Sequence, residues 1–453
     1  MQIIKKFLVT ILLFVFSLLP ANAQSGSFKQ VIKNNNLDRS ANISISIKDL
    51  KTGEEIYSKN PDRAQNPAST LKLLSFATSY DTLGENYTFQ TSTYLDRQNN
   101  LYIKLAADPL LNSEDLAKLL EKTKQKINYG KVKKIFIDDT ILPQIHYPKG
   151  WTNDDCLNIA PITPYIIDNN ELSIKIAKSL DDNSINIIQN DKYKYSFINN
   201  LKIGNENSIQ IFREYASSAD IITLSGIISK DYTLILQARN PKQFFITRLE
   251  NAFAKNKMPI KNRFNFKQTP QDARKIAQVE HTIQQVCATI LKNSNNCASE
   301  ILFALAGKKY NNCTTNCPQE IYQNALKMLE NFYREAGINT DKMTIIDSSG
   351  VSRYSALSTN NLTDAIIYLN KNYNIRNFLT TANEGTLTKR LRYLENQLWA
   401  KTGTMRGLSS IAGIIKTKNE QELAFAIIIQ DFTKSKSALK SIEDDLIDCM
   451  FNL

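Results

Sequence analysis

Histidine is scarce in this sequence, since only His146 and His281 occur among 453 residues. A Ser-His-Asp triad therefore has few candidate bases, and neither a Gly-x-Ser-x-Gly nor a His-Glu-x-x-His motif is present. Neither histidine stands at ligand spacing from the cysteines, which argues against a zinc centre. We predict no metal and no cofactor, and we expect His281, which precedes a predicted helix, to be structural.

Long apolar runs are also lacking beyond the N-terminus. The uncharged run from Phe7 to Leu19 follows Lys5 and Lys6 and ends in the small residues Ala21-Asn-Ala23. This run is shorter than the roughly 18 to 20 residues that a spanning helix needs. We therefore predict a signal peptide over residues 1–23 and a mature protein outside the cytoplasm. Disulfides are permitted there, and Cys313 and Cys317 are the pair closest in sequence.

Lysine and arginine exceed the acidic residues, giving a formal net charge of +12. Such a balance favours an acidic partner, namely an anionic wall polymer, a membrane surface or nucleic acid. Export makes nucleic acid the poorest of the three. The lysines are scattered, which is typical of a solvated surface and consistent at most with weak attachment to a membrane. The sequence leaves dimerisation open.

Strand patterns occur at both ends of the chain. Ile43, Ile45 and Ile47 alternate with polar residues, and the apolar runs 408–415 and 423–429 flank a polar turn, which predicts an antiparallel hairpin. A last helix is expected from about Ser435. Between about residues 91 and 272 there are many short alternating segments broken by Asn, Asp and Gly, which indicate β-rich insertions. We predict an α+β fold whose sheet is built from the two termini.

Three short motifs occur in order along the chain: Ser69-Thr-Leu-Lys72, Ser294-Asn-Asn296 and Lys401-Thr-Gly403. Ser69 at the start of a helix would share one face with Lys72, whose neutral amine can deprotonate the hydroxyl. Burial and a second cation would lower the pKa of Lys72, and Lys401 is a candidate for that cation. Ser294 suits a proton relay to the leaving amine, and Asn296 can hold Lys72 and bind a substrate amide.

The third motif should lie on an edge strand beside the serine, because the apolar hairpin begins just after it. Gly403 would let a substrate backbone approach closely, while Lys401 and Thr402 suit a terminal carboxylate. The backbone N–H groups of Ser69 and Thr404 would form an oxyanion hole. Each motif alone is weak, but the conjunction in this order indicates a serine acyl-transfer site.

The chain resembles the low-molecular-mass class C penicillin-binding proteins, which are D-alanyl-D-alanine carboxypeptidases and endopeptidases of the bacterial periplasm. The segments that carry the resemblance are Asp49–Glu54, Asn66–Lys72, Asp108–Asp115, Asp347–Arg353 and Ala400–Thr404. The resemblance implies a serine β-lactamase/transpeptidase-like domain with inserted β-rich domains. It places the penicillin-binding domain at residues 24–90 and 273–453, and inserted domain two at 91–272 with a third nested at about 172–238.

The same resemblance implies a pocket for the distal end of a diaminopimelate side chain, formed by Asp155 and Arg353. The residues that flank Asp155 depart from the family pattern, so Asp154 is an alternative. Arg353 has the alternative interpretation of a surface salt bridge. Arg406 replaces the small or amide residue of many relatives, which leaves substrate preference open. Trp151 and Tyr165 are expected in the core more than in a ligand groove.

The resulting prediction is a periplasmic serine-type D-Ala-D-Ala carboxypeptidase, D,D-endopeptidase or both. It would act on peptidoglycan stem peptides through an acyl-enzyme on Ser69 and would be acylated by β-lactam antibiotics. Two alternatives stay open. One is a serine β-lactamase, although no Glu for deacylation is assignable. The other is a catalytically silent wall-binding scaffold on the same fold.

Overall fold

The computed structural model describes residues 21–152, 155, 159–179, 184–213, 221–310, 317–433 and 435–453. Most of the predicted signal peptide lies outside these residues, and its last three residues open helix α2 (Ala21–Asn34). Cys313 also lies outside them, and so does the predicted pairing with Cys317. Among the described residues, no helix is both long and apolar enough to cross a bilayer.

The largest sheet has six strands in the order β14-β15-β16-β17-β1-β2. Its strands are β14 (Thr380–Thr381), β15 (Leu398–Met405), β16 (Leu408–Lys416), β17 (Glu422–Gln430), β1 (Asn42–Asp49) and β2 (Glu55–Lys59). The predicted hairpin is confirmed, because β16 and β17 pair antiparallel along their length. β1 pairs with β17, so Ile45 lies opposite Ile427 and the two ends of the chain share one sheet, as predicted.

Helices cover both faces of this sheet, and for that reason β16 and β17 are buried at nearly every position. On one face, Ile43, Ile45 and Ile47 form a core with Leu446 of α12 (Lys436–Phe451), near α2 and the short α3 (Leu37–Ser40). The second core lies against the opposite face. It includes residues of α4 (Lys72–Leu83), α8 (Ile283–Lys292), α9 (Asn296–Lys309), α10 (Pro318–Glu335) and α11 (Thr359–Tyr373).

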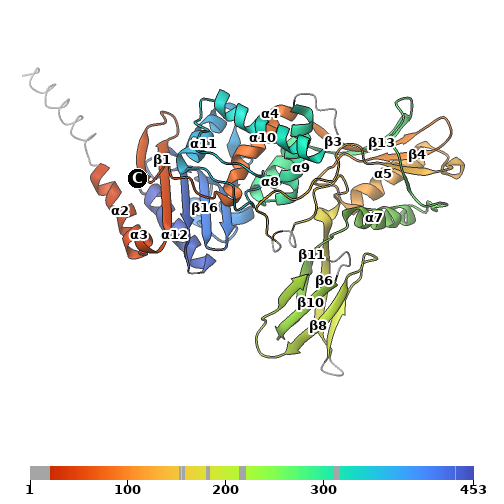
Figure 1. Cartoon of the computed structure of the whole chain (residues 1–453), viewed down its shortest axis with the longest axis horizontal. Helices are drawn as coiled ribbons and strands as arrows, with labels where there is room; N and C mark the ends of the chain where they lie inside the picture. Colours follow the sequence, from red (N-terminus) through yellow and green to blue (C-terminus); the bar gives the residue numbers. More distant parts are fainter. Residues whose placement is uncertain are drawn as a thin grey trace, which may run out of the picture.

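A five-stranded sheet lies beyond these helices, at the opposite end of the molecule from the first sheet (Figure 1). Its order is β12-β5-β4-β3-β13, with β12 (Asn265–Phe266), β5 (Ile135–Asp138), β4 (Leu101–Lys104), β3 (Thr88–Leu95) and β13 (Arg274–Thr282). Helices α5 (Ser113–Lys126) and α7 (Pro241–Lys255) pack with it. β3 and β13 pair with each other, so the chain enters and leaves this region through neighbouring strands.

Two three-stranded sheets project from the rest of the molecule (Figure 1). One has the order β11-β6-β7 and the other β8-β10-β9. The strands are β6 (Glu171–Lys178), β7 (Ile185–Ile188), β8 (Ser196–Ile203), β9 (Gln210–Arg213), β10 (Ile221–Ile228) and β11 (Tyr232–Gln237). Glu171 pairs with Gln237, so this region also begins and ends at adjacent positions.

Candidate active site

Ser69 and Lys72 lie where a tight turn becomes a helix. Residues Ala68–Leu71 form a 3-10 turn and α4 begins at Lys72, so the α-helix starts one turn later than the sequence suggested. Ala68 has a positive φ of 46°, and the backbone of Gly350 packs against its carbonyl group. This geometry brings Lys72 Nζ to 2.9 Å from Ser69 Oγ.

The Lys72 side chain is fully buried, and three oxygen atoms surround its nitrogen. Besides Ser69 Oγ, these are Asn296 Oδ1 at 2.6 Å and the carbonyl oxygen of Ser349 at 2.7 Å. Burial lowers the pKa of Lys72 to about 7, although the nearby Asp347 and Glu300 carboxylates act to raise it. A substantial fraction of neutral amine at neutral pH follows, and that is the form able to accept a proton from Ser69.

The second motif occupies the loop between α8 and α9. Asn295 caps α9 by accepting a hydrogen bond from the N–H of Ala298, and Asn296 is the first residue of that helix. Ser294 has a positive φ of 58°. Its hydroxyl is 2.9 Å from Lys401 Nζ, so the loop contacts both lysines, Lys72 through Asn296 and Lys401 through Ser294.

Lys401 lies on β15 and is fully buried. Its pKa is held well below the ordinary value, first by burial and then by the charge of Lys72. The predicted effect of burial on Lys72 is confirmed, because burial is the main cause that lowers its pKa. The charges of Asp347 and Glu300 act in the opposite direction and raise the pKa of Lys72. The expected lowering by Lys401 stays a prediction.

Gly403 is where β15 passes the nucleophile. A Cβ atom at this position would lie 2.8 Å from the backbone nitrogen of Ser69 and 2.3 Å from Ser410 Oγ. Only glycine therefore fits without displacing the turn that holds Ser69. β14 pairs with β15 at Trp399 and Ala400 alone, so among the described strands the segment from Lys401 to Thr404 is an edge, as predicted. Thr402 is buried there, whereas Thr404 and Arg406 are exposed.

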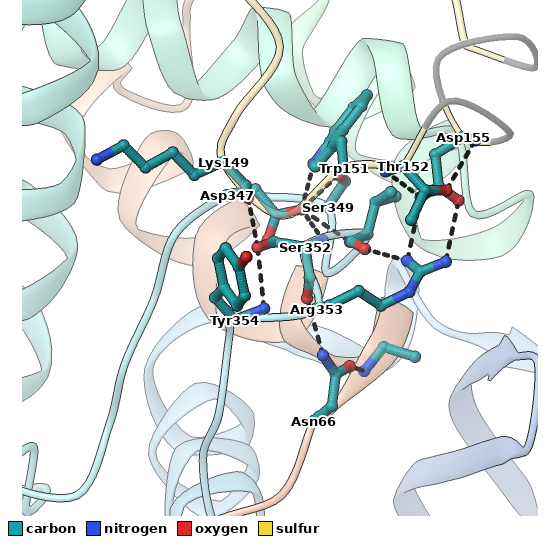
Figure 2. A network of polar contacts seen from close by, with 12 residues as sticks. Asn66, Lys149, Trp151, Thr152, Asp155, Asp347, Ser349, Ser352, Arg353 and Tyr354 are labelled. Carbon is teal, nitrogen blue, oxygen red and sulfur yellow. Dashed lines mark hydrogen bonds and ion pairs between the residues drawn. The ribbon is translucent and has the colours of Figure 1, made fainter.

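Asp155 and Arg353 are also brought together, from segments nearly 200 positions apart in the sequence (Figure 2). Arg353 Nη1 lies 3.1 Å from Asp155 Oδ2, and Nη2 lies 3.4 Å from Oδ1. The backbone N–H and the hydroxyl of Thr152 both donate to the same carboxylate. The alternative, Asp154, lies outside the described residues.

The loop that carries Arg353 is organised by a buried carboxylate. Asp347 Oδ2 accepts hydrogen bonds from Trp151 Nε1 at 2.9 Å and from the N–H groups of Val351 and Ser352, each at 2.7 Å (Figure 2). Trp151 is thus partly buried and tied to this loop. The Tyr165 hydroxyl donates to Asp139, and His281 Nδ1 lies 2.7 Å from Asp108 Oδ2, which gives both residues structural contacts.

The sequence reasoning missed Glu300, a fully buried carboxyl on α9. A signal was present, since Glu300 is the one charged residue in the otherwise apolar or small stretch from Cys297 to Gly307. It also stands four positions after Asn296, which puts both on one face of the helix. Ionisable residues are almost never fully buried without a partner, so a glutamate in this apolar stretch indicates a specific structural or functional role.

Fold and site together define a class, that of serine-type peptidases with the α+β fold of the penicillin-binding proteins. The chain belongs to the D-Ala-D-Ala carboxypeptidase 3 (S13) family, whose model matches residues 24–452. The family match agrees with the enzyme predicted from the sequence, a serine-type D-Ala-D-Ala carboxypeptidase, and favours it over a β-lactamase.

Individual relatives are distant but matched over most of their length. A D-alanyl-D-alanine carboxypeptidase of Actinomadura sp. (strain R39) is 23% identical, over 85% of this chain and 77% of its own. The crystal structure of penicillin binding protein 4 (dacB) from Haemophilus influenzae superposes with a TM-score of 0.79 at 18% identity, covering 94% of this chain and 99% of that one. The same protein complexed with a novel β-lactam gives a TM-score of 0.74 at 17% identity, with the same coverage. At this identity the structural likeness establishes the fold.

Proposed function

We propose that Ser69 attacks the carbonyl of the penultimate D-Ala in a peptidoglycan stem peptide. The ester bond to Ser69 Oγ forms as the peptide bond breaks, and D-Ala or a cross-bridged amine leaves with a proton. Water then hydrolyses the ester. The observation that carries this proposal is the 2.9 Å contact between Ser69 Oγ and the buried Lys72 amine.

The other motif residues receive roles that their positions support. Lys72 takes the proton of Ser69, and Ser294, hydrogen-bonded to Lys401, relays a proton to the leaving amine. Asn296 holds Lys72 and binds a substrate amide. Along the β15 edge, Lys401 and Thr402 face the terminal carboxylate of the substrate and Gly403 admits its backbone. The N–H groups of Ser69 and Thr404 form the oxyanion hole.

The Asp155 and Arg353 pair is proposed to bind the third residue of the stem peptide. A bidentate guanidinium–carboxylate pair presents donors and acceptors to a ligand that has both an ammonium and a carboxylate group, as the distal end of diaminopimelate does. Arg353 is 39% exposed, so part of its guanidinium remains accessible to a substrate. β-Lactams are proposed to acylate Ser69.

The domain division and location follow the family resemblance. We propose a peptidase domain that contains the six-stranded sheet, an inserted domain built on the five-stranded sheet, and a nested domain formed by the two three-stranded sheets. The pairing of β3 with β13 supports an insertion there, close to the expected limits at residues 91 and 272. We further propose that the protein acts in the periplasm. The mature chain, without Lys5 and Lys6 of the predicted signal peptide, keeps a formal net charge of about +10, which favours contact with anionic wall or membrane surfaces.

The test is intact-mass spectrometry of the mature protein after brief exposure to benzylpenicillin, together with release of D-Ala from an acyl-D-Ala-D-Ala peptide. Wild-type protein is expected to form a stable adduct and to release D-Ala, and Ser69→Ala to do neither. Rapid destruction of the drug without an adduct would show a β-lactamase. A folded protein with neither adduct nor turnover would favour the silent scaffold.

A further inference from the structure

Both oxygens of the buried Glu300 carboxyl accept hydrogen bonds from neighbouring groups. Its Oε1 accepts hydrogen bonds from the N–H groups of Ser348, at 3.1 Å, and Ser349, at 2.9 Å. Its Oε2 accepts one from the Tyr322 hydroxyl at 2.6 Å. The side chain is fully buried, so these donors replace the water that the carboxylate loses.

The Ser348-Ser349 segment is held from both sides. Its two N–H groups bind Glu300, while its two carbonyl oxygens point toward α4, where Ser75 Oγ donates to Ser348 O at 2.6 Å and Lys72 Nζ to Ser349 O at 2.7 Å. The next residue, Gly350, lies so close to Ala68 that a Cβ atom there would meet its carbonyl oxygen at 1.8 Å. The segment therefore connects Glu300 directly to the turn of the nucleophile.

We propose that Glu300 is a positioning residue for acyl transfer, which fixes the Ser349 carbonyl that orients Lys72 and sets how readily Lys72 gives up its charge. This role rests on the proposed function of Ser69 and Lys72.

The orienting effect follows from the valence of the amine. A neutral lysine nitrogen has two hydrogens and one lone pair. With the hydrogens donated to Asn296 Oδ1 and Ser349 O, the lone pair points to the remaining neighbour, Ser69 Oγ. Without a fixed Ser349 carbonyl, the amine can rotate and the lone pair is no longer held on the serine hydroxyl.

The electrostatic effect follows from the charges that face Glu300. The charged groups are Lys72 on α4 and Asp347 in the loop, with Lys401 of β15 acting through Lys72. Tyr322 on α10 and Cys297 on the same helix also face it but are neutral, because their pKa values are raised. Burial, and then the charge of Asp347, raise the pKa of Glu300 to about 7, while its hydrogen bonds favour the carboxylate. The charged carboxylate raises the pKa of Lys72. Removing that charge must therefore lower the pKa of Lys72 and make the neutral amine available at lower pH.

Two substitutions separate the two effects. In Glu300→Gln the amide oxygen can still accept from Ser348 and Ser349, and the amide N–H can donate to Tyr322, so the geometry is kept and the charge is lost. In Glu300→Ala the segment loses its anchor as well. The measurement is the second-order rate constant for acylation by benzylpenicillin, followed by intact mass from pH 5 to 9.

For Glu300→Gln we expect a plateau rate within about threefold of wild type. The rise of the rate with pH should be displaced to lower pH, because the carboxylate charge that raises the pKa of Lys72 is gone. For Glu300→Ala we expect the plateau itself to fall at least about tenfold. Glu443→Gln is the matched control, since Glu443 is an equally buried glutamate, on α12, bound to Arg390. The acylation rate of Glu443→Gln should rise at the same pH as that of wild type. All rates are normalised to the folded fraction of each variant.

The role is overturned if the rise of the Glu300→Gln rate with pH moves no further than that of Glu443→Gln, or if folded Glu300→Ala keeps the wild-type plateau. Should Glu300→Ala fail to fold, the pH at which the Glu300→Gln rate rises decides alone. A wild-type protein that forms no adduct at any pH overturns the proposed function instead, so the two failures are distinguishable.

Discussion

At the scale of single residues, the protonation of Lys72 controls the proposed chemistry. Its pKa of about 7 means that the ammonium dominates below this pH and the amine above it. Acylation should therefore rise with pH through about 7 and then level off. Lys72→Arg keeps a cation that does not deprotonate, so we expect acylation to fall by about 1,000-fold or more at every pH. The pH dependence of benzylpenicillin acylation checks both statements. If the acylation rate of Lys72→Arg still rises with pH through about 7, a group other than Lys72 must control that rise.

A second prediction at this scale concerns Gly403. An added methyl group would lie 2.8 Å from the Ser69 nitrogen, so β15 or the nucleophile turn must shift. We expect Gly403→Ala to slow acylation by about 100-fold, because displacements near 1 Å at a reacting group have costs of this size. Gly53→Ala is the control, with a positive φ of 76° and open space around it. It should lower the free energy of unfolding by about 1 kcal/mol and leave acylation unchanged. Equal acylation rates for the two variants would contradict the close approach of Gly403 to the Ser69 backbone nitrogen.

At the scale of elements, hydrophobic periodicity predicted the strands and helices whose formation depends on the local sequence pattern. The β16–β17 hairpin, the terminal helix capped by Ser435 and the strand with Ile43, Ile45 and Ile47 are all present. The motifs were found because each is short and occurs in its required context. Glu300 stands out locally as the one charged residue of an apolar helical stretch. Its role could not be predicted, because its partners Ser348 and Ser349 are contributed by a loop nearly 50 positions away. The 3-10 turn at Ser69 was also not predicted. It is held by local hydrogen bonds from Ala68 to Asn66 and from Thr70 to Pro67, and Gly350 packs against it.

The two loops that carry Asp155 and Arg353 give a prediction at the same scale. We expect Arg353→Ala to raise the KM for a stem peptide with a free diaminopimelate end by about 10-fold or more, since hydrogen bonds to charged groups contribute about 1.5 to 3 kcal/mol. Acylation by benzylpenicillin, which lacks that end, should not change. Arg334→Ala is the control, because Arg334 pairs with Glu330 on the surface of α10. A peptide lacking the diaminopimelate amine and carboxylate that shows the same rise in KM would mean that Arg353 only maintains the loop.

At the scale of the whole molecule, the six-stranded sheet combines strands from the N-terminal and C-terminal parts of the chain. β1 pairs with β17 across almost the entire sequence, and the proposed inserted domain begins and ends on the paired strands β3 and β13. The proposed nested domain is attached in the same way, because Glu171 pairs with Gln237 and the N–H of Ala238 donates to Asn170 O. Regions attached through adjacent strands add little closure entropy to the domain that carries them, so the proposed peptidase domain can accommodate both proposed insertions.

This attachment predicts that the nested unit can be removed without loss of the chemistry. None of the residues proposed for catalysis or substrate binding lies between positions 172 and 236. Replacing this segment by a short Gly-Ser linker should close without strain between Glu171 and Gln237. The free energy of unfolding should fall, because Phe244 loses its contact with Tyr193 and Arg248 its ion pair with Asp191. Benzylpenicillin acylation of the folded shortened protein should stay within about threefold of wild type, since distant sites are nearly independent. A folded variant that acylates more than tenfold slower would show instead that the nested unit supports the Ser294 loop, and the Asn295–Asn169 hydrogen bond is where that support would act.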